Sequence, residues 1–468
     1  MFETGVRQLR MALSMATGRR IDPRNLERLV GDAVATLGVF GSAGDDLQQM
    51  LDGPFADPDG RRGFQEQSLR RTARRLARRS PHYRGLLADT GIDVRRFTLD
   101  DLAKVPLTTK RDLIANAADF LVDGARPAVT TRTTGTTGRP AEVWVSRYEL
   151  DLWSGLAALS GLLRDEIRPG DCMQVNISSR ATAAMQQNMN VCRLVGARAL
   201  PLGILDPEES LDSLVSQSPT LLATYPSYLA ELVKAARRRG LDPTAFRLRR
   251  IDCGGEVLSP TLSTAAAETF GAPVNDTFGM TEVLPVSGRV CERGHLHHDL
   301  NVGYVEVLDP DSGQPVGAGE VGTAVVTPYY PYRECMPVFR YDTRDLVRRL
   351  PDDQLDCTLA AVPATSRILG KADQILRISG RTVMPRTLVE AVEALPGERW
   401  PARFSARVRP DHLELSVGGA LGQGGLERLL AEDGGEVPVV CVPGGTVGTA
   451  LRRVRADLVE TTFTRQES

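Results

Sequence analysis

The sequence has no long apolar segment and no excess of charge of either sign. None of the apolar runs among its 468 residues approaches the roughly 20 residues that a membrane helix needs. Residues 11–16 are too few and too polar to form the core of a secretory leader. The formal net charge is −2, so the overall charge favours neither nucleic acid nor a membrane as a partner. We therefore expect a small molecule as the ligand.

Paired cysteines are also lacking. The seven cysteines are scattered, an odd number without close pairs, which fits a reducing compartment better than a disulfide framework. The sequence therefore predicts a cytoplasmic protein. With 42% apolar and 25% charged residues the composition is typical of a globular enzyme, and the length suggests about two to four domains or one large domain with an appendage.

Lysine is nearly absent. It occurs only at positions 104, 110, 234 and 371, whereas arginine supplies the rest of the positive charge. Each lysine is therefore informative, and none follows Lys371.

Short apolar runs alternate with helical patterns between residues 141 and 330. This alternation predicts an α/β fold with mainly parallel strands flanked by helices, and ligands bind at the carboxyl ends of such strands. An amphipathic helix with a basic, solvated face is expected over 64–90. The expected strands are 142–145, 172–177, 197–202, 221–224, 250–253, 304–308 and 322–326, and the expected helices are 148–163, 181–194, 226–239 and 259–270.

The segment after residue 370 has a different pattern. Its order of strands and helices predicts a small α+β domain. The expected elements are strands at 374–378, 402–408, 412–417 and 437–442 and helices near 385–395 and 424–432. We therefore divide the chain into a partly helical extension (1–60), a large domain (61–370), a joint (371–374) and a small domain (375–468).

The segment Thr133–Pro140 combines four threonines with two glycines and ends in arginine and proline. Glycines let the backbone approach a ligand closely, and successive N–H groups form a concavity that binds phosphate. Arg139 would add a charge-assisted hydrogen bond. The segment is not a Walker loop, because no Gly-x-x-x-x-Gly-Lys-Ser/Thr occurs. A threonine-rich surface turn is the alternative interpretation.

Three further stretches suggest a binding site. Asp252–Glu256 follows an apolar strand, so its two glycines would offer bare backbone on which a flat ring can stack. Asp276–Glu282 offers an aromatic ring, a hydroxyl and a carboxylate. The carboxylates of Tyr341–Leu346 could accept hydrogen bonds from ribose hydroxyls. Each stretch alone is also compatible with a turn, a helix cap or an ion pair with arginine.

The order of these four stretches resembles that of the AMP-forming adenylating superfamily of acyl-CoA synthetases, luciferases and peptide-synthetase adenylation domains. The phenylacetate–CoA ligase branch is the most similar. The resemblance extends from about residue 64 to 395, and it includes Ser80–Tyr83, Val105–Leu113, Tyr225–Tyr228 and Ile368–Asp373. It implies a large adenylate-forming domain and a small mobile C-terminal domain, with ATP and magnesium as cofactors and coenzyme A as a candidate acceptor.

The resemblance also implies a role for individual residues. Contacts to the ATP phosphates would come from Thr133, Thr134, Gly135, Thr136, Thr137, Gly138 and Arg139. The adenine slot and its surroundings would be formed by Gly254, Gly255, Glu256, Asp276, Thr277, Phe278 and Gly279, and the ribose side by Asp345 and Lys371. Thr281 would contact the α-phosphate, Glu282 would bind magnesium, Asp373 would be the hinge, and Tyr225, Pro226 and Ser227 would line the substrate pocket.

The chain departs from this family at its end. The small domain normally supplies a lysine that reaches the α-phosphate and the substrate carboxylate, but here Thr449 stands near that position. Arg452 and Arg453 lie close by and are the candidate catalytic replacements, although a guanidinium does not reproduce the geometry of an ammonium group. Ordinary thioester formation is therefore in question.

Three functional hypotheses follow. The first is ATP- and magnesium-dependent adenylation of a small aromatic carboxylic acid, with transfer to coenzyme A or an amine, in specialised metabolism such as antibiotic biosynthesis. The second is activation of nitrite to diazotise an aromatic amine. The third is a nucleotide-binding homologue whose catalysis has decayed. The oligomeric state stays open, with a homodimer as one candidate.

A zinc site is a further expectation from the resemblance, because many phenylacetate–CoA ligase relatives carry a Cys/His cluster beside the active site. Cys291, His295, His297 and His298 lie close in sequence, and Cys357 follows downstream, but the paired cysteines of the family are missing. The candidate ligands are Cys291, His297 and Cys357. A polar hairpin with isolated cysteines is the alternative.

Overall fold

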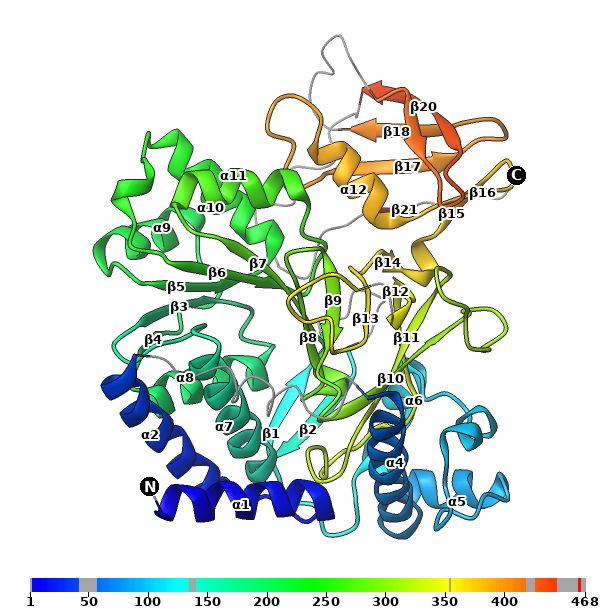
Figure 1. Cartoon of the computed structure of the whole chain (residues 1–468). Coiled ribbons are helices and arrows are strands. Elements are labelled where there is room, and N and C mark those ends of the chain that lie inside the picture. Colours follow the sequence, from blue (N-terminus) through cyan, green and yellow to red (C-terminus); the bar gives the residue numbers. More distant parts are fainter. Residues whose placement is uncertain are drawn as a thin grey trace.

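The structure is a computed structural model that describes residues 2–41, 57–133, 140–352, 355–417, 426–443 and 462–463. A large body contains two main sheets with their helices, and a small domain formed by the residues after Lys371 lies above it in Figure 1. The three largest apolar clusters form separate cores, of which one belongs to the small domain. Among the described helices, none combines the length and apolarity that crossing a membrane requires.

The central sheet of the described residues has eight strands in the order β13-β9-β8-β7-β6-β5-β3-β4. Its parallel part consists of β3 (Cys172–Asn176), β4 (Arg198–Leu200), β5 (Leu221–Thr224), β6 (Arg250–Gly254) and β7 (Val274–Gly279). Its antiparallel part consists of β8 (Ser287–Val290), β9 (His295–His298) and β13 (Ala364–Ser366). The predicted α/β fold with mainly parallel strands is confirmed.

Helices cover both faces of the parallel strands. Figure 1 shows α9 (Pro207–Ser216), α10 (Pro226–Arg238) and α11 (Pro260–Phe270) on one face, and α7 (Arg147–Leu163) and α8 (Thr182–Val195) on the other. Burial on both faces explains why β3 reads as a buried run instead of an alternating one.

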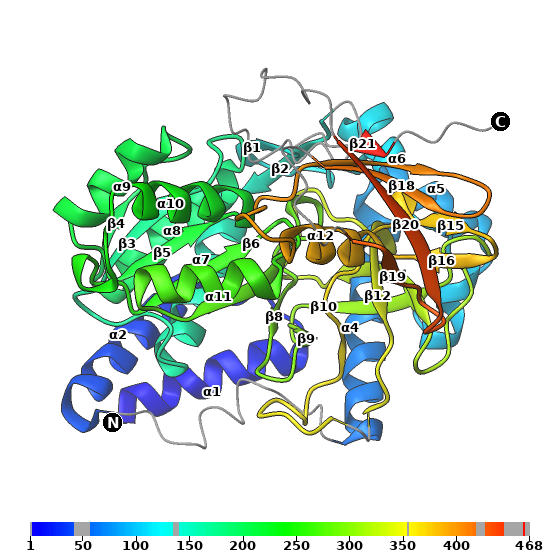
Figure 2. The same cartoon turned by 90° about the horizontal axis from the view of Figure 1, so that it is seen from above.

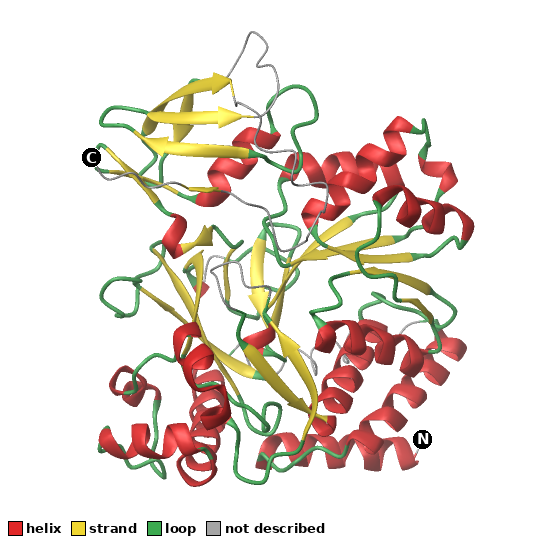
Figure 3. Cartoon of the chain, turned by 180° about the vertical axis from the view of Figure 1, so that it is seen from behind, coloured by secondary structure: helices red, strands yellow, loops and turns green. Residues whose placement is uncertain are grey.

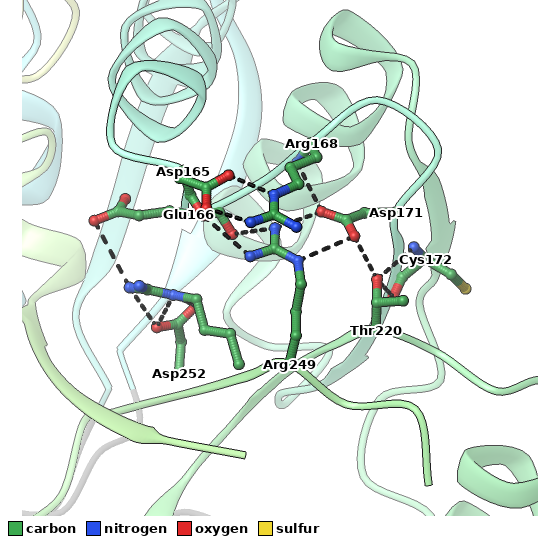
Figure 4. Close-up of polar contacts among 9 residues, drawn as sticks. Asp165, Glu166, Arg168, Asp171, Cys172, Thr220, Arg249 and Asp252 are labelled. Carbon is green, nitrogen blue, oxygen red and sulfur yellow. Dashed lines mark hydrogen bonds and ion pairs between the residues drawn. The ribbon is translucent and has the colours of Figure 1, made fainter. Parts of the chain in front are cut away.

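Three polar residues tie neighbouring parallel strands together at their amino ends. Asp171, Thr220 and Arg249 directly precede β3, β5 and β6. The Asp171 carboxylate accepts hydrogen bonds from Thr220 Oγ1 (2.7 Å) and from Arg249 Nη2 (2.6 Å) (Figure 4). Burial tends to raise the pKa of Asp171, but the bonds from Arg249 and Thr220 hold that pKa below its usual value. The charged pair therefore aligns the starts of the strands, so that their carboxyl ends also share one edge.

A second sheet lies beside the first in Figure 1. It contains β10 (Gly303–Leu308), β11 (Val321–Pro328), β12 (Tyr341–Arg348) and β14 (Gly370–Lys371), all antiparallel. Several elements precede this sheet in sequence. They are the helices α4 (Pro58–Arg79), α5 (Pro81–Asp89) and α6 (Lys110–Asn116), the 3₁₀ turn η1 (Leu99–Lys104), and the hairpin of β1 (Pro127–Arg132) and β2 (Glu142–Ser146), which follows α6.

The single helix expected over 64–90 is wrong, because α4 and α5 are separate. Ser80 has extended backbone between them, and its hydroxyl accepts a hydrogen bond from Tyr83 N (3.4 Å) at the start of α5. Pro81 cannot continue α4, since a proline has no N–H for the helical ladder.

The described part of the amino-terminal extension is mainly helical. Residues 2–41 contain α1 (Phe2–Thr17) and α2 (Pro23–Phe40), which lie along one edge of the body in Figure 2. The fully buried Leu26 packs against Gly155 of α7, where an added Cβ would come within 2.6 Å of it. This contact attaches α2 to the helical layer beneath the central sheet.

The small domain contains a five-stranded sheet and α12 (Pro385–Glu393), as Figure 3 shows. Its sheet consists of β17 (Phe404–Val408), β18 (Leu413–Val417), β19 (Arg428–Leu430), β20 (Glu436–Pro443) and β21 (Thr462–Phe463), and the ribbon β15 (Leu376–Ile378) and β16 (Arg381–Val383) precedes α12. The helix expected at 424–432 is wrong in the described residues, which form β19. Asp433 Oδ1 accepts a bond from Gly435 N (2.9 Å), and this tight turn pairs β19 with β20.

Candidate functional site

The carboxyl ends of β6 and β7 expose bare backbone, because two glycines stand there. A Cβ on Gly254 would lie 2.8 Å from Thr277 Oγ1 and 2.9 Å from Thr277 O, so no larger residue fits between the strands. Gly255 has φ +83°, and a Cβ there would meet the Tyr225 ring at 3.2 Å. The resulting flat surface at the sheet edge suits the stacking of a planar ring.

The residues predicted for the substrate pocket lie next to this surface. Tyr225 precedes α10, and its hydroxyl accepts a hydrogen bond from Ser178 N (3.2 Å). Pro226 and Ser227 form the first turn of α10, where Ser227 N and Oγ donate to the Glu256 carboxylate (2.8 and 2.9 Å). Glu256 therefore caps α10, and any contact of this side chain with adenine stays a prediction.

Glu282 is a buried carboxylate at the centre of the site. It lies in the 3₁₀ turn η4 (Thr281–Val283) and is 4% exposed. Its Oε1 accepts a hydrogen bond from Tyr341 Oη (3.3 Å), and burial together with the Glu282 charge raises the pKa of Tyr341. Within the described residues Glu282 takes part in no salt bridge, so this buried carboxylate is suited to binding a cation.

Lys110 faces the same site, and the sequence reasoning missed it. Thr108 N donates to Arg340 O and Asp342 N donates to Thr108 O (both 2.9 Å), which holds the start of α6 beside β12. Burial lowers the pKa of Lys110, while Glu282 raises it and Lys371 lowers it further. The charges of Glu282 and Lys371 therefore act on the Lys110 ammonium group, which has no hydrogen bond or ion pair in the part of the chain that the structure describes. The scarcity of lysine was the available signal.

Asp345 and Lys371, predicted for the ribose side, lie opposite each other on β12 and β14. Lys371 Nζ is 2.9 Å from Asp345 Oδ1 and donates to Thr343 O (3.0 Å). Asp373 is exposed in the turn η6 (Ala372–Gln374) that follows, where the chain enters the small domain. Its role as the hinge stays a prediction.

The threonine-rich loop is anchored at its base. Thr133 N donates to Ala141 O and Ala141 N donates to Thr133 Oγ1 (both 3.0 Å), so the two ends of the loop are held together. Thr134, Gly135, Thr136, Thr137, Gly138 and Arg139 lie outside the described residues, as do Arg452 and Arg453. Their predicted roles are therefore not tested.

Thr277 and Phe278 of the stretch 276–279 both contact other residues of the protein. Thr277 Oγ1 donates to Cys253 O (2.8 Å), which joins β7 to β6. The Phe278 ring is 8% exposed and meets the His298 ring edge-on, with centroids 5.5 Å apart. Stacking of Phe278 on adenine stays a prediction, and Gly279 at the end of β7 is exposed.

Asp276 is the carboxylate of this edge with the clearest pKa change. Burial raises the pKa of Asp276 to about 6, and the guanidinium groups of Arg386 and Arg367 offset part of that rise. Arg386 Nη2 lies 3.9 Å from Asp276 Oδ2. Asp276 is therefore largely ionised at neutral pH although its surroundings disfavour the charge.

Asp276→Asn should stabilise the protein at pH 7.5 but not at pH 4. The folded-state pKa of about 6 exceeds the unfolded value of roughly 3.9, so the stabilising contribution of this group is complete below pH 4 and is lost as the pH rises through 6. An amide avoids the buried charge, and the gain in unfolding free energy should be about 1–3 kcal/mol. Thermal denaturation at both pH values measures this gain, with Asp373→Asn as an exposed control. An equal shift of the melting temperature at both pH values would contradict the prediction.

Four potential metal ligands meet at one end of the central sheet. The ligand atoms of Cys291, His295, His297 and Cys357 lie within 4.8 Å of one another. His297 Nδ1 is 3.0 Å from Val362 O, which directs Nε2 toward Cys357 Sγ at 3.3 Å. Two thiols and two imidazoles are a set that suits tetrahedral zinc. The structure thus brings the predicted ligands together and adds His295.

His298 does not belong to this cluster. It lies on the other face of β9, where Nε2 is 3.3 Å from Thr365 Oγ1, and burial lowers the pKa of His298 to about 4. The alternation of side chains along β9 therefore separates His295 and His297 from His298.

Comparisons with known proteins show which family the chain resembles. A family profile described as AMP-binding enzyme matches residues 87–329. The chain is 29% identical to phenylacetate-coenzyme A ligase of Thermus thermophilus over 71% of this chain and 74% of that protein, and 28% identical to phenylacetate-coenzyme A ligase of Pseudomonas putida over 72% and 76%.

Solved structures share the fold. A crystal structure of 2-hydroxyisobutyryl-CoA ligase in the postadenylation state with 2-HIB-AMP is 21% identical, covers 84% of this chain and 88% of its own, and has a TM-score of 0.69. The same ligase in the thioesterification state, with 2-HIB-AMP and CoA, is 22% identical over 86% and 90%, with a TM-score of 0.60.

Proposed function

The chain belongs to the AMP-binding enzyme family, as an AMP-forming ligase of the phenylacetate–CoA ligase-like branch, and from that premise we propose that it converts a small aromatic carboxylic acid into its acyl-adenylate with ATP and magnesium. The observation that carries the proposal is the buried Glu282 carboxylate, whose charge acts on Lys110, together with the backbone that Gly254 and Gly255 expose. This combination provides a surface for a flat ring and a cation for phosphate oxygens.

The reaction needs no protein nucleophile. An oxygen of the substrate carboxylate attacks the α-phosphorus, a new oxygen–phosphorus bond forms, and the bond to pyrophosphate breaks. Glu282 would hold the magnesium ion, which would neutralise phosphate charge, and Thr281 would contact the α-phosphate. Lys110 would donate to phosphate oxygens from the α6 side, while Asp345 would accept from ribose hydroxyls as Lys371 keeps its carboxylate in place.

An aromatic acid is proposed because the relatives of known activity are phenylacetate-coenzyme A ligases and because the Tyr225 ring lies against Gly255. The acceptor of the activated acyl group is proposed to be coenzyme A or an amine. The absence of lysine after Lys371 makes an acceptor other than coenzyme A worth testing directly.

Pyrophosphate release measures this function. We expect release with ATP, magnesium and a panel of aryl acids, with formation of an acyl-adenylate seen by mass spectrometry, and Glu282→Gln should reduce it at least about 100-fold because a metal ligand is lost. Adding coenzyme A or amines to separate reactions identifies the acceptor. Release only with nitrite and an aryl amine would contradict the proposed acid substrate, and near-normal turnover by Glu282→Gln would contradict the proposed site.

Lys110→Met should weaken the adenylation half-reaction. A charge-assisted hydrogen bond to phosphate contributes about 1.5–3 kcal/mol, so the rate of pyrophosphate release should fall by roughly 10- to 100-fold. Lys104→Met is the matched control, because Lys104 is exposed on η1 and forms a surface ion pair with Asp101 (2.8 Å). Thioester or amide formation from a synthetic acyl-adenylate should change less than pyrophosphate release. Equal effects of the two substitutions would exclude a phosphate contact by Lys110.

We also propose that Cys291, His295, His297 and Cys357 hold a structural zinc ion. The ion would link the β8–β9 turn to the segment that contains Cys357. Val362, a few residues after Cys357, already contacts β9 through the bond between Val362 O and His297 Nδ1. All four positions would be filled by protein ligands, so the ion would take no part in the reaction.

Metal analysis of the purified protein should then find about one zinc per chain after dialysis. Cys357→Ser should lose most of that zinc and lower the melting temperature, because one of four ligands is replaced by a weaker one. Cys441→Ser is the control, since Cys441 is a partly exposed thiol in the small domain. Full zinc content in Cys357→Ser, or none in the unaltered protein, would refute the site.

A further inference from the structure

A tryptophan of the small domain is inserted into the large domain. Trp400 is 7% exposed and belongs to the apolar cluster that α9, α10 and α11 form, whose other buried members lie between Leu211 and Ala272. The Arg237 guanidinium of α10 lies over the Trp400 ring, 5.5 Å from its centroid. The tryptophan therefore fills the core of a neighbouring domain instead of the core of its own.

Charged pairs lie on either side of Trp400 in sequence. Arg237 Nη1 is 2.5 Å from Glu398 Oε1, and Arg403 Nη2 is 3.2 Å from Glu231 Oε1. Both partners in the large domain belong to α10. Residues 398, 400 and 403 thus all contact α10. These three contacts fix how the segment lies along the helix.

A second contact joins α12 to the start of α11. Arg386 Nη1 donates to Leu258 O (3.0 Å), and Ser259 Oγ, at the N-cap of α11, donates to Glu393 Oε2 (2.5 Å). Arg386 and Glu393 are 6% and 4% exposed. Glu393 Oε1 also accepts from Ala402 N (2.8 Å), so the same carboxylate connects α12 with the residues beside Trp400.

We infer that Trp400, Arg386 and Glu393 form an interdomain dock that holds the small domain on α10 and α11, and that any rotation about residues 371–374 first has to release it. Rotation would transfer the indole ring from an apolar cluster to water, and it would leave the Leu258 carbonyl without the Arg386 donor. The docked orientation is therefore stabilised by the burial of Trp400 and by the bond from Arg386 to Leu258 O. This inference needs the division into two domains but not the proposed chemistry.

Hydrogen exchange on the full-length chain tests the dock. Trp400→Ala should raise exchange at least about tenfold in the peptides of α10, α11 and α12 and accelerate tryptic cleavage at Arg377 or Arg381, because the docked population falls. Peptides of β3 and β5, and those of β17 and β18 in the small domain, should exchange as before. Asp311→Ala is the control, since Asp311 and Arg377 form an exposed pair between the domains at 3.3 Å and this substitution leaves both tryptic sites in place.

A second variant keeps the test decisive if Trp400→Ala unfolds the small domain. Glu398→Lys places a like charge against Arg237 at a partly exposed position, so both domains should stay folded. It should change exchange and cleavage in the same direction, by a smaller factor. Exchange and cleavage equal to those of the unaltered protein in Glu398→Lys, and in any folded Trp400→Ala, would overturn the dock. Equal effects of Asp311→Ala would do the same.

Discussion

The site depends on the alignment of the parallel strands, which the Asp171 carboxylate secures at their amino ends. Thr220 and Arg249 reach this carboxylate from the residues before β5 and β6, so the three neighbouring strands begin at one level. Parallel strands that start together also end together, and their carboxyl ends place Tyr225 beside Gly255 and Gly254 beside Thr277. The charged contact far from the site thus supports the strand register on which the site's surface depends.

The site contains charged groups that are buried or partly buried, and burial disfavours their charge when no ligand is bound. Glu282 is buried with one tyrosine donor, and Lys110 is partly buried without an ion pair in the described residues. Such groups are costly in isolation and become favourable when a metal ion and phosphates neutralise them. The arrangement is therefore organised for a highly charged ligand, in agreement with membership of the AMP-binding enzyme family.

The small domain adds a constraint of its own. Its sheet and α12 have a separate core, yet Trp400 is buried among residues of the large domain. Arg386 contributes both to this contact and to the surroundings of Asp276, whose pKa it lowers. Docking of the small domain and the charge at the end of β7 are therefore coupled through one guanidinium group, so that a change in domain orientation also changes the electrostatics of the predicted adenine edge.

The sequence by itself determined the α/β class, the parallel strands and the order of the motifs, because apolar periodicity and glycine placement are local properties. It led to a wrong helix at 424–432, where the Asp433–Gly435 turn favours a hairpin, and to one helix where Ser80–Pro81 divides two. Only the tertiary structure placed Lys110 beside Glu282, added His295 to the cysteine cluster and inserted Trp400 into another domain. These contacts join residues far apart in the chain, and no local pattern encodes which distant surfaces meet.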